Sequence, residues 1–329
     1  MIKLAVFGAG RIGYVHALNA ASLPSVRLEY IVDPIPSAHL DDLETKTGAR
    51  VVEADTVFAD PSIDGVIIAS STDTHAELIL KAVAAGKSMF CEKPISLNFK
   101  LVTEVAEAVA KAKTPCMLGF QRRYDPNFRL VRERIQSGVT GRLEQLVMHT
   151  RDPSPPPVEY VKRSGGMFRD MTIHDFDMAR FIMGEEPVSV YAQGSNLVDP
   201  AIGEAGDIDT AFIVLKYASG AMATIVNSRR SSYGYDQRLE LHGSEGLLCA
   251  GNILENQVQH YGKQGCTSAL PEHFFLQRYK SAYAAEWEHF VAVLRGEAVP
   301  DCSGDDGERA LYLADKALES LRSQREIVL

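Results

Sequence analysis

A glycine-rich turn near the start of the chain has the spacing that cradles a pyrophosphate. It lies between an apolar segment and a segment of helical periodicity and reads Gly8-Ala9-Gly10-Arg11-Ile12-Gly13. Gly8 permits the tight turn, Gly10 lets the backbone approach phosphates, and Gly13 lets the helix pack on the sheet. Asp33 follows at the end of the next apolar segment, where a carboxylate can bind ribose hydroxyls. Because this carboxylate would repel a 2′-phosphate, the pattern predicts NAD in preference to NADP.

A lysine in the segment Cys91-Glu92-Lys93-Pro94 could place a positive charge beside a substrate. The segment follows an apolar run, and ligands of doubly wound sheets bind at the carboxyl ends of the strands. Pro94 restricts the backbone there and allows a cis bond in the turn. Taken alone, these residues favour a surface lysine that simply follows a strand.

An aspartate and a histidine stand one helical turn apart in the segment Gly165–Asp177. On a helix Asp170 and His174 would share one face, with Asp177 a turn further along. A histidine beside a carboxylate suits proton transfer near neutral pH. The alternatives are a helix cap with an ordinary histidine, or a metal site made of these three side chains. We expect no metal, because a nicotinamide enzyme with a nearby lysine needs none.

Donors and acceptors also cluster in the segment Asn227–Asp236, which includes Arg229, Tyr233 and Tyr235. Such a cluster at a strand end suits a small, hydroxyl-rich ligand. A solvated hairpin is the alternative interpretation of the same residues.

The elements that position these groups fall into two patterns. In the first 120 residues short apolar runs alternate with helical segments, which predicts a doubly wound parallel sheet of the Rossmann type. After that, alternating segments such as 210–217 and 221–228 predict a half-buried, mainly antiparallel sheet, followed by helices at 282–295 and 307–323. We therefore expect an α/β protein with a nucleotide-binding domain over 1–119 and an α+β domain over 120–329.

Composition narrows the class of protein further. The chain has 329 residues, which is typical of two domains, and its 46% of hydrophobic residues is enough to form a hydrophobic core. Its formal net charge of −9 is unfavourable for nucleic-acid binding. Its five cysteines show no metal-ligand spacing, and no apolar run approaches a membrane span. We expect reduced thiols, no signal peptide and a cytoplasmic location.

Taken together, these motifs resemble the glucose–fructose oxidoreductase/inositol dehydrogenase (Gfo/Idh/MocA) family over nearly the whole chain. The marks are the glycine turn, Asp33, the Glu92-Lys93-Pro94 triplet and the Asp170–His174 pair. More specific segments resemble the inositol dehydrogenases of that family: 119–125, 151–153, 162–166, 228–230 and 233–236.

The resemblance implies a Rossmann domain, a second domain with a large open sheet, and a homo-tetramer built through that sheet. It also implies catalytic roles for Lys93, Asp170 and His174. Cofactor contacts would come from the glycine turn with Arg11 and Ile12, and from Asp33, Ser71, His75, Glu92 and Lys93. Substrate contacts would come from the catalytic residues and from Arg123, Asp152, Tyr233 and Tyr235. Asp152 stands where some relatives carry asparagine.

The implied activity is NAD-dependent oxidation of myo-inositol to 2-keto-myo-inositol. Within the family, scyllo-inositol or an aldose such as glucose is the alternative substrate. An NAD-dependent glycosidase and a catalytically silent cofactor-binding regulator are the alternatives outside dehydrogenases.

Overall fold

The chain folds into two compact units in the computed structural model, which describes residues 1–329. Residues 1–121 and 283–311 form the first unit, and residues 122–282 and 312–329 form the second. We expected a single domain boundary after residue 119. The division is more complex, because residues 283–311 return to the first unit. The reason is apolar packing, since Trp287 and Phe290 are fully buried against Phe90 of that unit.

The first unit is built on a six-stranded sheet in the order β3-β2-β1-β4-β5-β6, with every pair parallel. This order is that of a dinucleotide-binding fold, and it confirms the expected Rossmann sheet. Its central strands are buried on both faces, as their continuous apolar sequences require. The strands are β1 (Ile2–Phe7), β2 (Val26–Val32), β3 (Arg50–Val51), β4 (Gly65–Ile68), β5 (Ser88–Glu92) and β6 (Cys116–Gly119).

Helices connect these strands, as parallel neighbours require. They are α1 (Arg11–Ser22), α2 (Ala38–Thr47), α3 (Ala54–Ala59), α4 (Thr72–Ala84) and α5 (Phe99–Ala112). Helix α11 (Lys280–Leu294) and helix α12 (Gly304–Ser323) each cross a boundary between the two units. A short 3₁₀ turn, η1 (Gln121–Tyr124), links the first unit to the second along the chain.

The second unit is built on a seven-stranded sheet in the order β12-β11-β7-β10-β9-β8-β15. All pairs are antiparallel except β7 with β10, so the sheet is mainly antiparallel, as expected. The strands are β7 (Leu143–Arg151), β8 (Pro187–Ser195), β9 (Thr210–Tyr217), β10 (Met222–Ser228), β11 (Asp236–Gly243), β12 (Gly246–Ala250) and β15 (Ile327–Val328).

One face of this sheet is buried and the other is open. Along β9 buried and exposed residues alternate strictly, as the sequence pattern predicts. The register puts five large apolar side chains on the open face, namely Tyr191, Phe212, Val214, Met222 and Leu247. A face of this kind is typical of a surface that another protein chain covers.

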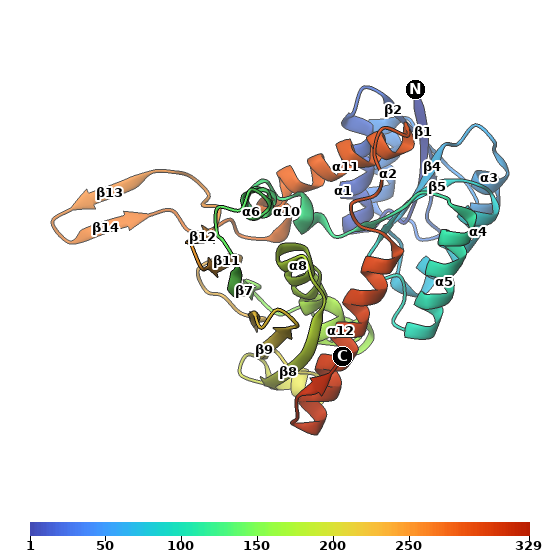
Figure 1. Cartoon of the computed structure of the whole chain (residues 1–329). Coiled ribbons are helices and arrows are strands. Elements are labelled where there is room, and N and C mark those ends of the chain that lie inside the picture. The colour runs from blue at the N-terminus through green and yellow to red at the C-terminus, as the bar shows by residue number, and fades with distance from the viewer. The chain divides into compact units, whose positions relative to one another are not determined.

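Helices and a hairpin complete the second unit (Figure 1). Its helices are α6 (Pro126–Gln136), α7 (Val158–Ser164), a π-helical turn η2 (Phe168–Thr172), α8 (Ile173–Met183), α9 (Pro200–Glu204) and α10 (Phe275–Arg278). Strands β13 (Gln259–Gly262) and β14 (Gly265–Ser268) pair only with each other, so this segment forms a separate arm and not a strand of the large sheet. None of the helices is both long and apolar enough to cross a membrane.

Candidate active site

The glycine turn has the geometry that a pyrophosphate site needs. Gly8 adopts φ +95°, and a Cβ on Gly8 would lie 2.6 Å from the Cα of Ser70. A Cβ on Gly13 would lie 2.0 Å from the carbonyl oxygen of Gly8, so only glycine allows helix α1 to pack this closely. A Cβ on Gly10 would meet nothing within 4 Å, which leaves open space at the helix N-terminus.

The surroundings of this turn fit NAD. No side chain caps the N-terminus of helix α1 and no acidic residue lies in its first turn, so its N–H groups and positive dipole end face the open space. Asp33 follows strand β2, and its two carboxylate oxygens accept the N–H of Ala9 at 2.6 Å and the N–H of Ile35 at 2.9 Å. The carboxylate thus borders the glycine turn, where it can bind ribose hydroxyls. Arg11 is exposed and Ile12 half-buried on the first turn of the helix.

The turn that carries Lys93 follows strand β5, with a cis bond between Lys93 and Pro94. Lys93 is half-buried, whereas Glu92 is buried and accepts the N–H of Lys93 at 3.1 Å. His75 is also buried, and its ring nitrogens lie 2.9 Å from the carbonyl oxygen of Pro94 and 3.1 Å from that of Ser70. Both ring nitrogens therefore face backbone groups of the protein, which makes His75 part of the support of this turn. Ser71 is exposed at the start of helix α4.

Asp170 and His174 lie in one continuous helical stretch of the second unit, but not on one regular α-helix as expected. Asp170 belongs to the π-helical turn η2 and His174 to the first turn of α8. Turns of this type occur often at functional sites. The carboxylate of Asp170 accepts the hydroxyl of Tyr160 at 2.8 Å and the guanidinium of Arg229 at 3.2 Å, so it is held in one orientation.

Arg229 lies among three carboxyl groups. Its side chain is 1% exposed, and its charge acts on Asp170, Asp152 and Asp207. Burial raises the pKa of Asp152 to about 7, against the opposing charge of Arg229, and the charge of Asp170 adds to the rise. Burial likewise raises the pKa of Asp207. The positive charge of Arg229 partly offsets the effect of burial on both carboxyl groups. The sequence showed a cluster at 228–230 but did not identify Arg229 as its centre, and it carried no signal for Tyr160.

Tyr233 and Tyr235 differ in their surroundings. Tyr233 is 38% exposed, and its hydroxyl donates to Asp236 at 2.6 Å and accepts from Arg151 at 3.1 Å. Tyr235 is buried, with its ring against Phe274, and burial raises its pKa well above the ordinary value. Of the two, only Tyr233 presents its side chain at the surface of the second unit.

Arg123, which the sequence suggested for substrate binding, lies in the interior of the second unit. Its guanidinium donates to the two carboxylate oxygens of Asp177 at 2.9 and 2.5 Å, and both side chains are buried. The neighbouring Arg122 similarly donates to the buried Asp175 at 2.7 Å. These ion pairs anchor helix α8. They engage the guanidinium of Arg123 with Asp177, so contact of Arg123 with substrate stays a prediction, and they remove Asp177 from a metal site with Asp170 and His174.

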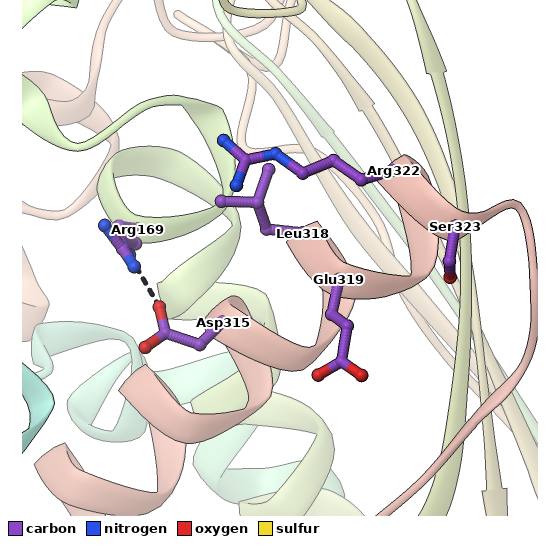
Figure 2. A pocket seen from close by; sticks show the side chains of 6 residues that line it. All are labelled: Arg169, Asp315, Leu318, Glu319, Arg322 and Ser323. Carbon is purple, nitrogen blue, oxygen red and sulfur yellow. Dashed lines mark hydrogen bonds and ion pairs between the residues drawn. The ribbon is translucent and has the colours of Figure 1, made fainter.

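A pocket of about 480 Å³ lies beside this region, lined by η2 and α12 (Figure 2). Two of its lining residues, Arg169 and Asp315, form an ion pair with a distance of 2.6 Å between Nε and Oδ1. Arg322 lies on the same helix as Asp315. The pocket contains none of the residues expected to contact cofactor or substrate. The Arg169–Asp315 ion pair instead attaches the turn that carries Asp170 to helix α12.

Two family descriptions match the chain. Residues 2–120 match the oxidoreductase family with an NAD-binding Rossmann fold, and residues 128–249 match the GFO/IDH/MocA C-terminal domain.

Full-length relatives agree with this assignment. The chain is 46% identical to an inositol 2-dehydrogenase of Rhizobium meliloti, over 99% of this chain and 98% of that one. It is 42% identical to a myo-inositol 2-dehydrogenase of Thermotoga maritima, over 100% and 98%. Its fold is similar to a crystal structure of scyllo-inositol dehydrogenase from Lactobacillus casei with bound NAD(H) and scyllo-inositol, at a TM-score of 0.91, 28% identity, and coverage of 100% and 99%. An NAD-binding Rossmann unit, a mainly antiparallel second unit and these similarities together establish that the chain belongs to the GFO/IDH/MocA family of oxidoreductases.

Proposed function

We propose that this chain is an NAD-dependent inositol 2-dehydrogenase, which oxidises myo-inositol to 2-keto-myo-inositol. The observation that carries the proposal is the placement of Asp170, which Tyr160 and Arg229 hold, one turn before His174 in the same stretch of helix. Full-length similarity to two proteins named as inositol 2-dehydrogenases supports the choice of substrate.

The chemistry follows from the acidity of the groups involved. A ring hydroxyl has a very high pKa, so the hydride leaves its carbon readily only as the hydroxyl proton is removed. We assign that proton to the imidazole of His174, which suits a base near neutral pH. The ammonium of Lys93 donates a hydrogen bond to the same oxygen and offsets its growing negative charge. When bound, NAD supplies the nicotinamide that accepts the hydride.

Asp170 orients the ring in this proposal. Its carboxylate binds a hydroxyl next to the reacting one, and Tyr160 and Arg229 keep that carboxylate in place. Correct placement of the reacting carbon accounts for a large share of the rate. Asp152 and Tyr233 are the candidates for further ring hydroxyls, with Asp152 donating a hydrogen bond when it is protonated.

The proposed site favours a neutral polyol over an acid or a phosphate. The arginines Arg122, Arg123 and Arg229 are all paired with carboxylates, so none is left to bind an anionic substrate. Buried hydrogen-bonding groups reject an analogue that lacks a hydroxyl, because their own partners are then missing.

A panel of polyols tests the proposal. We expect NADH formation with myo-inositol at a kcat/KM above that for scyllo-inositol, D-chiro-inositol, D-glucose and a deoxy-inositol. His174→Ala and Lys93→Ala should each lower kcat by about 10²-fold or more, with NAD affinity near that of the parent protein. A tenfold preference for scyllo-inositol or an aldose would overturn the substrate but leave the chemistry. Normal turnover by either variant would overturn the assigned role.

The proposal extends to assembly and location. The open face of the seven-stranded sheet carries the apolar side chains named above, which favours a homo-tetramer that buries it. All five cysteines are free thiols, which favours a reducing compartment such as the cytoplasm.

A further inference from the structure

Two buried histidines hold the residues on either side of Lys93. On the N-terminal side, the Nε2 of His16 lies 2.7 Å from Oε1 of Glu92, and the other oxygen of Glu92 accepts the N–H of Lys93. On the C-terminal side, the Nδ1 of His75 lies 2.9 Å from the carbonyl oxygen of Pro94. The two histidines can therefore fix the backbone of Lys93 through Glu92 and Pro94, without contacting the lysine side chain.

The only tryptophan of the chain selects the tautomer of His16. The indole N–H of Trp287 donates to Nδ1 of His16 at 3.0 Å, and an indole nitrogen can only donate. Nδ1 must therefore be the acceptor, which leaves the proton on Nε2 and aims it at Glu92. Trp287, His16 and the Lys93 N–H thus form one directed chain of hydrogen bonds that converges on the carboxylate of Glu92.

The loss of any one of these hydrogen bonds is costly, because the groups that form them are buried. His16 and Trp287 are 0% exposed and Glu92 is 8% exposed, so water has little access to replace a lost hydrogen-bond partner. Burial is the largest single influence on the pKa of Glu92 and would raise it, but the hydrogen bond from His16 and the nearby charge of Lys93 act together to hold this pKa below its ordinary value. The absence of a side chain on Gly119 leaves room for this arrangement, because a Cβ there would approach the Glu92 carboxyl carbon to 3.1 Å.

His75 restrains the turn from the opposite side. Its two nitrogens bridge the carbonyl oxygens of Ser70, after strand β4, and Pro94, after strand β5. A neutral ring donates to one of these oxygens and a protonated ring donates to both, so either state retains a link. The lysine turn is in this way tied to helices α1, α4 and α11.

We propose that His16, with Trp287, and His75 are positioning residues for Lys93: they act through Glu92 and Pro94 and set where the lysine ammonium lies. The inference rests on the catalytic role proposed for Lys93. A lysine displaced by about 1 Å would lower turnover by up to about 10²-fold without weakening the binding of NAD, whose glycine turn is unchanged.

The test compares replacements that differ only in hydrogen bonding. His16→Phe keeps an aromatic ring but gives Glu92 no donor, whereas His16→Gln offers an amide that can donate to Glu92 and accept from Trp287. We expect kcat to fall by about 10- to 100-fold in His16→Phe, with the KM for NAD within about twofold, and His16→Gln to recover most of the loss. Trp287→Phe and His75→Phe should each show a fall in kcat of the same kind.

Phe290→Leu is the matched control. Phe290 packs against Trp287 and Phe90 in the same cluster but takes part in none of these hydrogen bonds. It should lower the thermal midpoint and leave kcat unchanged. If kcat follows thermal stability in every variant, Phe290→Leu included, or if His16→Gln restores nothing, the positioning role is wrong. Where His16→Phe does not fold, Trp287→Phe and His75→Phe against Phe290→Leu give the same decision.

Hydrogen–deuterium exchange separates this inference from the proposed function. The peptide that contains Lys93 should exchange faster in His16→Phe and Trp287→Phe than in Phe290→Leu, whether or not inositol is the substrate. Unchanged exchange would overturn the inference even if the enzyme is active. Faster exchange in a protein whose Lys93→Ala variant turns over normally would instead overturn the role of the lysine.

Discussion

Replacing Asp152 with asparagine should stabilise the protein at alkaline pH and change little in acid. Burial raises the pKa of the Asp152 carboxyl from the ordinary 3.8 to about 7, although Arg229 opposes the rise. Between these two values the folded state holds a proton that the unfolded state releases. The free energy of unfolding therefore falls as the pH rises from about 4 through about 7.

The size of this effect follows from the difference between the two pKa values. Roughly three pH units at about 1.36 kcal/mol each give an upper limit of ~4 kcal/mol. Asp152 is half-buried, so water screens part of this penalty and we expect about 2 kcal/mol. Asparagine has the same shape and does not ionise, so the variant should be more stable than the parent by that amount at pH 8 and about equal to it at pH 4.5.

Urea unfolding followed by circular dichroism at the two pH values measures this difference. Asp209→Asn is the matched control with the opposite sign. Asp209 is also buried, but the N–H groups of Leu197, Asp199 and Val198 outweigh the burial and lower its pKa. That carboxylate stabilises the fold above its unfolded pKa, so its loss should destabilise the protein at pH 8 and matter less in acid. An Asp152→Asn variant that is less stable at pH 8, or shifted equally at both pH values, would refute the reasoning.

Four further replacements test other parts of the structure. Asp33→Ala should narrow the preference for NADH over NADPH by about tenfold in a binding titration, because it removes a carboxylate that repels a 2′-phosphate; an unchanged ratio would contradict the role of Asp33. Arg229→Met should cost about 3 kcal/mol in urea unfolding, because it leaves buried carboxylates unpaired. Phe212→Glu should dissociate the proposed tetramer in light scattering by placing a charge on the open sheet face, and a parent protein that is already monomeric would count against the tetramer. Glu286→Met should raise the thermal midpoint, more at pH 8 than at pH 5. Burial raises the pKa of Glu286, whose carboxyl has no hydrogen-bond partner. The folded protein therefore loses stability as the pH rises, because the unfolded state releases this proton more readily than the folded state does.

The local sequence pattern was enough to predict the main strands and the turns that carry the glycine motif, Asp33 and Lys93. The glycine turn, Asp33 and the Lys93 turn follow strands whose continuous apolar sequences mark them as buried and parallel. The strict alternation in β9 likewise marks one covered and one open face. These features depend on residues close together in the chain, where periodicity and turn chemistry decide the structure.

Contacts between distant segments could not be obtained in this way. Trp287 and His16 are 271 residues apart, and nothing in either segment shows that helix α11 returns to pack on the first unit. Arg123 and Arg229 look alike in sequence, yet one is paired with Asp177 inside the second unit and the other orients Asp170. A charged side chain takes its role from the partners that surround it after burial, and only tertiary packing brings those partners together. The sequence by itself therefore determined which groups are available for chemistry, whereas the folded structure decided which of them are committed to holding the others in place.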